Sequence, residues 1–480
     1  MSVIFSMSGR HNSYPFHVNH ANPRSIPSFC RDVLLEQINA SIDGNNTKGM
    51  KVNVALMERA SSPHKNMRVL IAASVGNVLE WYDFVVYAIF AVQISHAFFP
   101  QKTQFTSLLA TFITFGVGFL ARPIGAIVLG AYGDRSGRGA TLTLTVLLMA
   151  SGTLGIALCP PAAKIGIAAP VIVVIARLIQ GFSAGGEIGG AVALLSESAP
   201  SSRRAFYTSF QQMTQGGSFL LCGIMGIVVT SCFSRGQVDS WAWRIPFLFG
   251  AIIAPVGFYI RKQIDEPELY LTLRRQIGRA RPLRSILTEH WKELLIGIGV
   301  TILMAVSIYV MFYLPTFAHS MLKIQQSSAY LGFVISGLVP ILCPAAGILA
   351  DRFSRKLVMF VAAVCLAIYP YPAFRYLTHH PAGSTLIAVQ VGMMVFMAFY
   401  TGPVTALLGE LFPTYARSTG VALTYGTAVA IFGGFTPAIV SALAGYTGNK
   451  LAVAFWLAAS AALSAVSLLA VRDRSRQQLR

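Results

Sequence analysis

Charged side chains are scarce in this sequence. Only 11% of its 480 residues are Asp, Glu, Lys or Arg, whereas 54% are hydrophobic. A soluble domain covers one apolar core with charged residues, and this composition is too poor in charge for that. The lipid bilayer must therefore be the solvent for most of the chain, which excludes an ordinary soluble protein.

Patterns for metal, nucleotide and redox chemistry are also lacking. The six cysteines have no metal-binding spacing, no Walker phosphate-binding pattern occurs, and the apolar segments contain no cluster of His, Cys and Asp. Cys222 and Cys232 alone are close in sequence, and a helix would hold them about 15 Å apart, too far for a disulfide. The sequence therefore predicts no enzyme, no metal site and no cofactor.

Long apolar runs are abundant. A helix needs about 20 apolar residues to cross roughly 30 Å of hydrocarbon, and the sequence holds about twelve such runs. This predicts an all-α integral membrane protein with twelve transmembrane helices. The runs cover approximately residues 70–98, 105–132, 139–159, 168–197, 205–231, 242–261, 293–318, 327–350, 356–377, 385–409, 416–445 and 450–471.

Positive charge is concentrated in alternate loops. The net charge is +19, and loops with pairs such as Arg203 and Arg204 alternate with loops that hold single basic residues such as Lys102. By the positive-inside rule the basic loops and both termini are predicted to be cytoplasmic. The basic stretch 263–292 is interpreted as a linker between two halves rather than a nucleic-acid site.

The two ends of the chain differ from the spans. Residues 1–68 are polar, rich in Asn, Ser and His, and without a helical period, which predicts a disordered cytoplasmic tail. An alternative is that translation starts at Met50, Met57 or Met67, close to the first span. Residues 472–480 are predicted to form a short cytoplasmic C-terminal tail.

Internal similarity indicates a duplication. The segments Leu194–Pro200 and Leu407–Pro413 align at a constant offset, and the same offset places Arg204 on Arg417. The sequence therefore predicts two six-helix halves, at residues 69–262 and 293–471.

A loop motif is repeated once in each half. The first copy, G-A-Y-G-D-R-S-G-R, ends at Arg138, and the second, G-I-L-A-D-R-F-S-R-K, ends at Lys356. The acidic and basic residues of such a loop can contact neighbouring helix ends, where opposite charges and helix dipoles stabilise them. We expect both loops to lock one access state; the alternative is a role in topology alone. The predicted gating residues are Gly130, Asp134, Arg135, Gly137, Arg138, Asp351 and Arg352.

At this point the chain resembles the major facilitator superfamily, and within it the metabolite:proton symporter family. The resemblance rests on motifs at Gly76–Phe84, Phe119–Gly125, Arg177–Glu187 and Trp243–Phe247. The stretches Arg122–Tyr132, Gln180–Gly190 and Ala430–Pro437 most resemble the citrate-proton and tricarballylate symporters of that family. The resemblance implies two pseudo-symmetric halves and alternating access driven by a proton gradient, in a bacterial inner membrane.

Polar side chains inside the predicted spans mark a candidate site, because a charge in the membrane is unfavourable unless it is paired or hydrated. At 1.5 Å per residue those of the first, second and fourth spans fall in one layer near mid-membrane. Arg122 is the first candidate, since guanidinium offers a bidentate fork for a carboxylate. The predicted substrate ligands of these spans are Asn77, Arg122, Arg177 and Gln180, and the predicted proton-coupling groups are Glu80, Asp83 and Glu187. The alternative for each charged group is a permanent structural ion pair.

Further ligands are expected on later spans. Gln211, Gln212 and Gln215 lie on the fifth span, and tyrosines lie on the seventh, tenth and eleventh. An isolated Tyr in a membrane helix more often packs or anchors the helix. The tyrosines are Tyr309, Tyr313, Tyr400 and Tyr425. Of the glutamines and tyrosines, we predict as ligands Gln211, Tyr313, Tyr400 and Tyr425.

Together these observations predict proton-coupled uptake of a di- or tricarboxylate such as citrate. The expected partners are a small organic acid, protons and the lipid bilayer, with no nucleic acid, and the protein is expected to work as a monomer. Alternatives within the same class are uptake of proline, betaine, shikimate or 2-oxoglutarate. A membrane enzyme or a sensor without transport is disfavoured, because the sequence shows neither a catalytic constellation nor a signalling domain.

Overall fold

A computed structural model describes residues 77–136, 138–186, 199–252 and 282–473, together with Gly189, Val192, Leu195 and Ser196. All of these belong to one compact unit, Arg68–Arg480, and the regular elements among them are helices. The predicted tail 1–68 and most of the predicted linker 263–292 lie outside the described residues. The all-α class is confirmed.

The first half is built from apolar helices that match the predicted spans. The first span is a bent pair, Asn77–Ile89 and α4 (Ala91–Phe98), that meet at 65°. The remaining elements are α5 (Gln104–Leu120), α6 (Arg122–Ser136), α7 (Arg138–Leu158), α8 (Ala162–Ile165), α9 (Ala168–Ser183), α11 (Arg204–Cys232), α12 (Arg235–Ser240) and the helix Ala242–Ile252.

The second half follows a short helix, α15 (Pro282–Thr288). Its elements are α16 (Trp291–Leu322), α17 (Gln326–Leu338), α18 (Cys343–Arg352), α19 (Arg355–Ile368), α20 (Pro370–His379), α21 (Gly383–Leu411), α22 (Arg417–Ala428), α23 (Thr436–Thr447) and α24 (Ala452–Ala470). Between α22 and α23 the chain forms a π-helical turn, Val429–Gly433.

The spans agree with the apolar runs of the sequence. In the described part of the chain, eight helices are long and apolar enough to cross a membrane, and the bent pair makes a ninth. Three shorter apolar helices, Thr143–Leu158, Ala168–Ser183 and Ala242–Ile252, fall in three further predicted runs. Large apolar side chains such as Leu158, Ile341 and Val466 are exposed on the outside, as expected of a surface that faces lipid.

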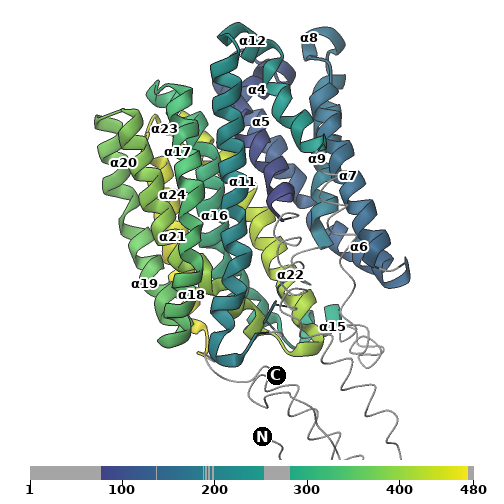
Figure 1. The fold of residues 1–480 in the computed structure, drawn as a ribbon, viewed down its shortest axis with the longest axis vertical. Helices are drawn as coiled ribbons and strands as arrows, with labels where there is room; N and C mark the ends of the chain where they lie inside the picture. The colour runs from purple at the N-terminus through teal and green to yellow at the C-terminus, as the bar shows by residue number, and fades with distance from the viewer. Residues whose placement is uncertain are drawn as a thin grey trace, which may run out of the picture. The chain divides into compact units, whose positions relative to one another are not determined.

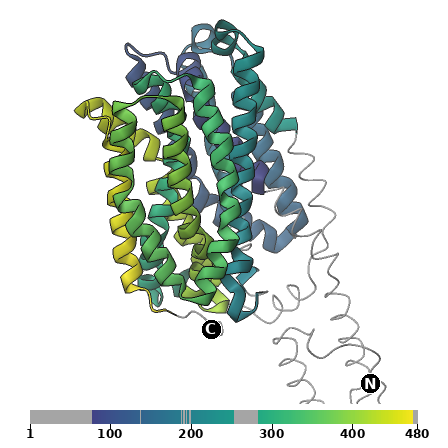
Figure 2. The same ribbon diagram turned by 60° about the vertical axis from the view of Figure 1, so that its left-hand side comes forward.

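The two halves lie side by side along their length. Figures 1 and 2 show the first half in purple to teal and the second in green to yellow. Helix α11 packs against α17, α18 and α21 of the second half, and α5 packs against α23. A site between the halves is therefore lined by helices from both.

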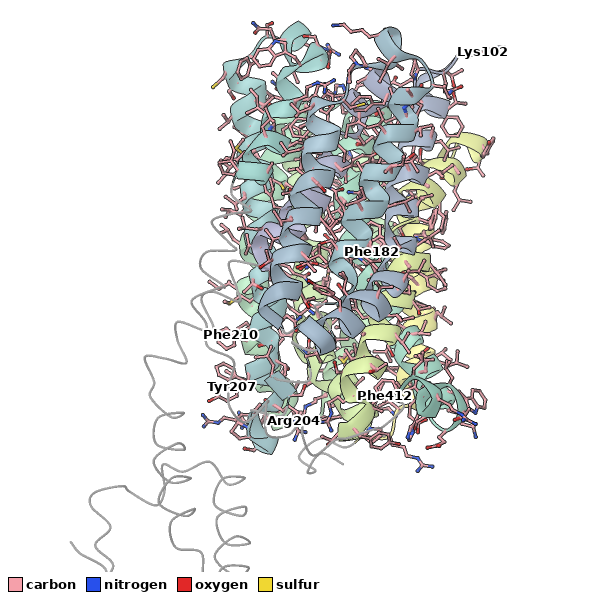
Figure 3. The ribbon with its side chains drawn as sticks, turned by 90° about the vertical axis from the view of Figure 1, so that its right-hand side faces the viewer. Lys102, Phe182, Arg204, Tyr207, Phe210 and Phe412 are labelled. Carbon is pink, nitrogen blue, oxygen red and sulfur yellow. The ribbon has the colours of Figure 1, made fainter. Side chains whose placement is uncertain are left out.

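A charged network joins the halves at one end of the bundle. Figure 3 shows Arg204 at this end and Lys102 at the opposite end. Arg204 of the first half forms an ion pair with Glu410 of the second half, and Glu410 also binds Arg355. The guanidinium of Arg355 in turn lies 2.8 Å from the carboxylate of Asp351. All four side chains are buried or nearly so, which makes the network a strong constraint on this end.

Asp351 caps the first turn of α11 from the other half. Its carboxylate oxygens accept hydrogen bonds from the backbone amides of Ala205 (3.1 Å) and Phe206 (2.9 Å). These amides have no partner within their own helix, and a negative charge is favourable at a helix N-terminus. The second copy of the loop motif thus holds the halves together, although its sequence departs from the first copy.

The predicted equivalence of Arg204 and Arg417 is visible in their hydrogen bonds. Arg204 Nε donates to the carbonyl of Ser196 at 3.3 Å, and Arg417 Nε donates to the carbonyl of Gly409 at 2.7 Å. Each acceptor lies eight residues before its arginine. Two structurally equivalent arginines in the two halves are what a duplication produces.

We expect Glu410→Gln to destabilise the protein, because it leaves the buried Arg204 and Arg355 without their shared carboxylate. Breaking a buried ion pair from one side reduces the free energy of unfolding by about 3–5 kcal/mol. Thermal denaturation in detergent measures the change, and the exposed Glu289 provides the control substitution Glu289→Gln. Equal melting temperatures for Glu410→Gln and wild type would contradict a role for this network in stability.

Candidate functional site

Arg122 lies at the break between α5 and α6, inside the bundle. Its side chain is only 3% exposed, and its guanidinium carbon lies over the rings of Trp81 (5.7 Å), Phe84 (4.7 Å) and Phe119 (4.7 Å). Rings at this distance attract a cation through their quadrupole. Among the described residues, none of the three guanidinium nitrogens has a hydrogen-bond partner. Arg122 is therefore a buried cation whose hydrogen-bonding capacity is unused.

A second buried arginine lies nearby on α9. The guanidinium of Arg177 contacts the rings of Tyr87 (4.6 Å) and Phe115 (4.8 Å), and its Nη1 donates to Gln180 Oε1 at 2.8 Å. Gln180 Nε2 donates to Thr153 Oγ1 on α7 at 2.9 Å. Unlike Arg122, Arg177 is thus held by a series of side-chain hydrogen bonds that links α9 and α7 of the first half.

Asp83 interacts with Thr153, the last residue of this hydrogen-bonded series. Its side chain is 3% exposed and interacts electrostatically with Arg177 and with the Thr153 hydroxyl. Its Oδ1 has no hydrogen-bond partner in the part of the chain that the structure describes. Gly250 packs so closely that a Cβ there would lie 2.4 Å from Oδ1, so a larger residue at 250 would displace the carboxylate. Asp83 therefore occupies the interior of the first half.

Two tyrosines of the second half face Arg122. Tyr309 on α16 and Tyr425 on α22 both interact electrostatically with Arg122 and with Glu80. The Tyr309 ring packs 5.1 Å from the ring of Phe119, and Gly433 leaves room for it, because a Cβ there would lie 2.8 Å from Tyr309 Cε2. Both hydroxyl groups are buried, and neither has a hydrogen-bond partner among the described residues.

Two small cavities lie between the halves. The first is lined by Asn77, Trp81, Val192, Gln211, Gln212, Gln215, Met304, Val404, Thr405, Leu408, Val421 and Tyr425. The second is lined by Arg122, Pro123, Ala126, Ala184, Gly185, Ala422, Leu423, Tyr425 and Gly426. Tyr425 lines both, and the ring of Trp81 lines the first while it lies against Arg122. The cavities are therefore adjacent: they share Tyr425, and Trp81 of the first cavity contacts Arg122 of the second.

Several predicted ligands gather at these cavities. Arg122, Tyr425, Asn77 and Gln211 line one or the other, and Glu80 lies close to Tyr425. Asn77 Nδ2 donates to Thr214 Oγ1 at 2.7 Å, which ties the first span to α11.

Other predicted ligands lie elsewhere. Tyr400 donates to the carbonyl of Val300 at 2.6 Å, a contact inside the second half, and Tyr313 packs against Phe112 and Phe317. Neither tyrosine lines either cavity. Arg177 and Gln180 line neither cavity and connect with Asp83 instead.

The first predicted gating loop is described only in its backbone. Gly130, Asp134 and Arg135 belong to α6 and Arg138 begins α7, while the side chains of this stretch lie outside the described part. Gly137 and Glu187 also lie outside the described residues. In the second copy, Asp351 takes part in the network between the halves, and the guanidinium of Arg352 lies 5.8 Å from the ring centroid of Phe353.

The structure adds residues that sequence reasoning did not select. Tyr309, rather than Tyr313, faces Arg122, and Trp81, Thr153 and Thr405 all contact the candidate groups. Tyr309 and Tyr313 are one helical turn apart on the same face, so their spacing alone cannot separate them. Trp81 lies between Glu80 and Asp83 in the motif Gly76–Phe84, and its place in that motif was the sequence signal for it.

A helical membrane bundle of two related halves, with polar and ionised side chains at their interface, is typical of a secondary transporter. Residues 69–288 and 282–467 match the family described as "Sugar (and other) transporter". The chain belongs to this family of the major facilitator superfamily, whose members are transporters and not enzymes.

Curated relatives cover most of the chain. A citrate-proton symporter of Klebsiella pneumoniae is 36% identical over 82% of this chain and 88% of the relative. The inner membrane metabolite transport protein YhjE of Escherichia coli is 33% identical, over 86% and 95%. The ectoine/proline transporter ProP of Corynebacterium glutamicum is 32% identical, over 87% and 86%.

A solved structure supports the fold. The xylose transporter XylE from E. coli, in a partially occluded inward-open conformation, superposes with a TM-score of 0.69. The match covers 86% of this chain and 99% of the XylE chain at 19% sequence identity. At that identity the likeness establishes the major facilitator fold and nothing about the substrate.

We expect Arg122→Met to make the unliganded protein at least as stable as wild type. Burying a charge without hydrogen bonds is unfavourable, so an apolar residue of similar length in its place is expected to be neutral or stabilising. Arg177→Met is the matched control, because Arg177 is equally buried but bonded to Gln180, and it should lower the melting temperature. A lower melting temperature for Arg122→Met than for Arg177→Met would contradict the unpaired state of Arg122.

Proposed function

We propose that this protein is a proton-coupled symporter that imports a di- or tricarboxylate such as citrate. The observation that carries the proposal is the buried guanidinium of Arg122, which has three nitrogens without hydrogen-bond partners among the described residues and lines a cavity between the halves. A carboxylate fits this group because it can accept two parallel hydrogen bonds and neutralise the charge. The names of the citrate-proton symporters among the relatives support the same substrate class.

The contacts between the halves support alternating access. The network of Arg204, Glu410, Arg355 and Asp351 holds the halves together at one end, which the positive-inside rule assigns to the cytoplasm. Opening toward the cytoplasm requires these contacts to break, and closing the opposite end replaces them. The protein works in the inner membrane with both termini in the cytoplasm, as the positive-inside rule indicates. It works as a monomer, because one chain supplies both halves of the site.

Asp83 is the proposed proton carrier. It is a carboxyl group inside the first half, one side of which has no hydrogen-bond partner in the described residues, and Arg177 lies close enough to respond to its charge. Protonation of Asp83 releases Arg177 from that attraction, and deprotonation restores it. Glu80 is a second candidate carrier, since it interacts with Tyr309 and Tyr425 beside Arg122.

A zwitterionic osmolyte such as proline or betaine is the second candidate substrate. Relatives named as ectoine/proline transporters favour it, and Glu80 could pair with a substrate cation while Arg122 binds the carboxylate. Against it, Arg122 itself lies against the rings of Trp81, Phe84 and Phe119. Those rings are the surfaces that would otherwise hold a quaternary ammonium group.

The decisive experiment is uptake of radiolabelled citrate into proteoliposomes with an inside-alkaline pH gradient. We expect accumulation that collapses with a protonophore, and no accumulation by Arg122→Ala. Arg122→Lys keeps the charge but not the planar fork, so it should retain at most a small part of the wild-type uptake. Uptake of betaine instead of citrate would overturn the tricarboxylate assignment, and unchanged citrate uptake by Arg122→Ala would remove Arg122 from the site.

We expect Asp83→Asn to separate citrate movement from proton movement. The variant should still exchange internal for external citrate, because the substrate site is intact, but it should not accumulate citrate in response to a pH gradient. Counterflow and gradient-driven uptake, measured in the same vesicles, report the two activities. Asp239→Asn, at an exposed aspartate of α12, serves as the control, and gradient-driven accumulation by Asp83→Asn would rule out Asp83 as the carrier.

A further inference from the structure

The two cavities between the halves differ in chemistry. The second cavity contains the guanidinium of Arg122. The first is lined by amide and hydroxyl groups of Asn77, Gln211, Gln212 and Thr405, and no charged side chain is among its described lining residues. One molecule that enters both cavities thus meets a cation at one end and neutral hydrogen-bonding groups at the other.

The first cavity, which we call the neutral cavity, contains an amide oxygen that is available to a ligand. Gln211 Oε1 is buried and has no hydrogen-bond partner in the described chain. The neighbouring Gln212 is engaged, because its Nε2 donates to Thr405 Oγ1 of α21 at 3.2 Å. A buried carbonyl oxygen without a donor is unfavourable, so a ligand that supplies an O–H group gains a hydrogen bond there.

The position of Gln211 is held by its own backbone. The Gln211 carbonyl accepts hydrogen bonds from Thr214 Oγ1 at 2.7 Å and from Asn77 Nδ2 at 3.4 Å. These contacts link α11 to the first span next to Trp81. The side-chain oxygen is therefore presented from a part of α11 that is tied to a second helix, which limits its freedom to find another partner.

A carbonyl oxygen binds a group that donates a hydrogen bond, and it does not bind an anion. An ionised carboxylate is an acceptor only and gains nothing at Gln211 Oε1, whereas a hydroxyl group donates to it. Tyr425 lines both cavities, and the hydroxyl groups of Tyr309 and Tyr425, which both interact with Arg122, can donate to a carboxylate. The arrangement suits a ligand with a carboxylate at one end and a hydroxyl group further along.

We infer that Gln211 is a specificity-determining residue that recognises the hydroxyl group of a hydroxy-polycarboxylate. The substrate spans both cavities, with one carboxylate at Arg122, Tyr425 beside it, and its hydroxyl group donating to Gln211 Oε1. The inference rests on the proposed function and goes further, because it predicts a preference between two acids with the same three carboxylates. Citrate carries the hydroxyl group, and tricarballylate lacks it.

The test compares dissociation constants for citrate and tricarballylate by titration calorimetry on the purified full-length protein. Wild type should bind citrate about ten times more tightly, the range expected for one hydrogen bond to a buried acceptor. Gln211→Leu should weaken citrate binding to the level of tricarballylate, so that the ratio falls to about one. Tricarballylate binding should be unchanged or tighter, since the unpaired oxygen is gone.

Gln390→Leu is the matched control. Gln390 is also a buried membrane glutamine whose amide atoms have no hydrogen-bond partner in the described chain, but it lines neither cavity. It should keep the wild-type ratio. Should Gln211→Leu fail to purify as a monodisperse protein, Gln211→Asn, which withdraws the amide by one methylene, provides the same comparison and the same expected loss of preference.

The outcomes separate the two proposals. Wild type that binds neither acid overturns the proposed carboxylate function, and the role of Gln211 falls with it. Wild type that binds both acids equally, or a Gln211 variant that keeps the preference for citrate, overturns only the role of Gln211. Loss of the preference in Gln390→Leu as well would show a general effect of buried glutamines and would also overturn it.

Discussion

The structure depends on a buried cation, Arg122, that has no hydrogen-bond partner among the described residues. Arg122 is enclosed by Trp81, Phe84 and Phe119, whose rings offset part of the loss of hydration but provide no acceptor for its N–H groups. Arg177, which lies near two of these rings, Phe84 (5.2 Å) and Phe119 (5.8 Å), shows the contrasting arrangement, because it donates to Gln180. Two arginines that share aromatic neighbours thus differ in hydrogen bonding, because Arg177 has a neighbouring amide as acceptor and Arg122 has no partner among the described residues.

Buried ion pairs and capping hydrogen bonds join the two halves. Asp351 caps α11 across the interface, and Glu410 holds Arg204 and Arg355 together. These contacts lie at one end of the bundle, whereas the cavities lie between the halves at Tyr425 and Trp81. A network of a few directional contacts can be broken and remade as a unit, which a continuous apolar interface cannot do as readily. The duplicated arginines Arg204 and Arg417 form equivalent hydrogen bonds to backbone carbonyls in the two halves.

The polar groups of the first half form a chain separate from the cavities. Asp83, Thr153, Gln180 and Arg177 connect the first span, α7 and α9 without lining either cavity. Arg122 and Arg177 are close enough to influence each other electrostatically. A change of charge at Asp83 can therefore act on the guanidinium of Arg122 through Arg177.

The sequence by itself determined the membrane class, the twelve apolar runs, the duplication and the candidates in the first, second and fourth spans. These follow from hydropathy and spacing, which act locally along the chain. Only the tertiary structure decided that Tyr309 rather than Tyr313 faces Arg122, that Tyr400 bonds within its own half, and that Arg177 is held by Gln180 while Arg122 is not. The physical reason is that hydrogen-bond partners and the depth of a residue along a helix are set by packing between spans, which no single segment encodes.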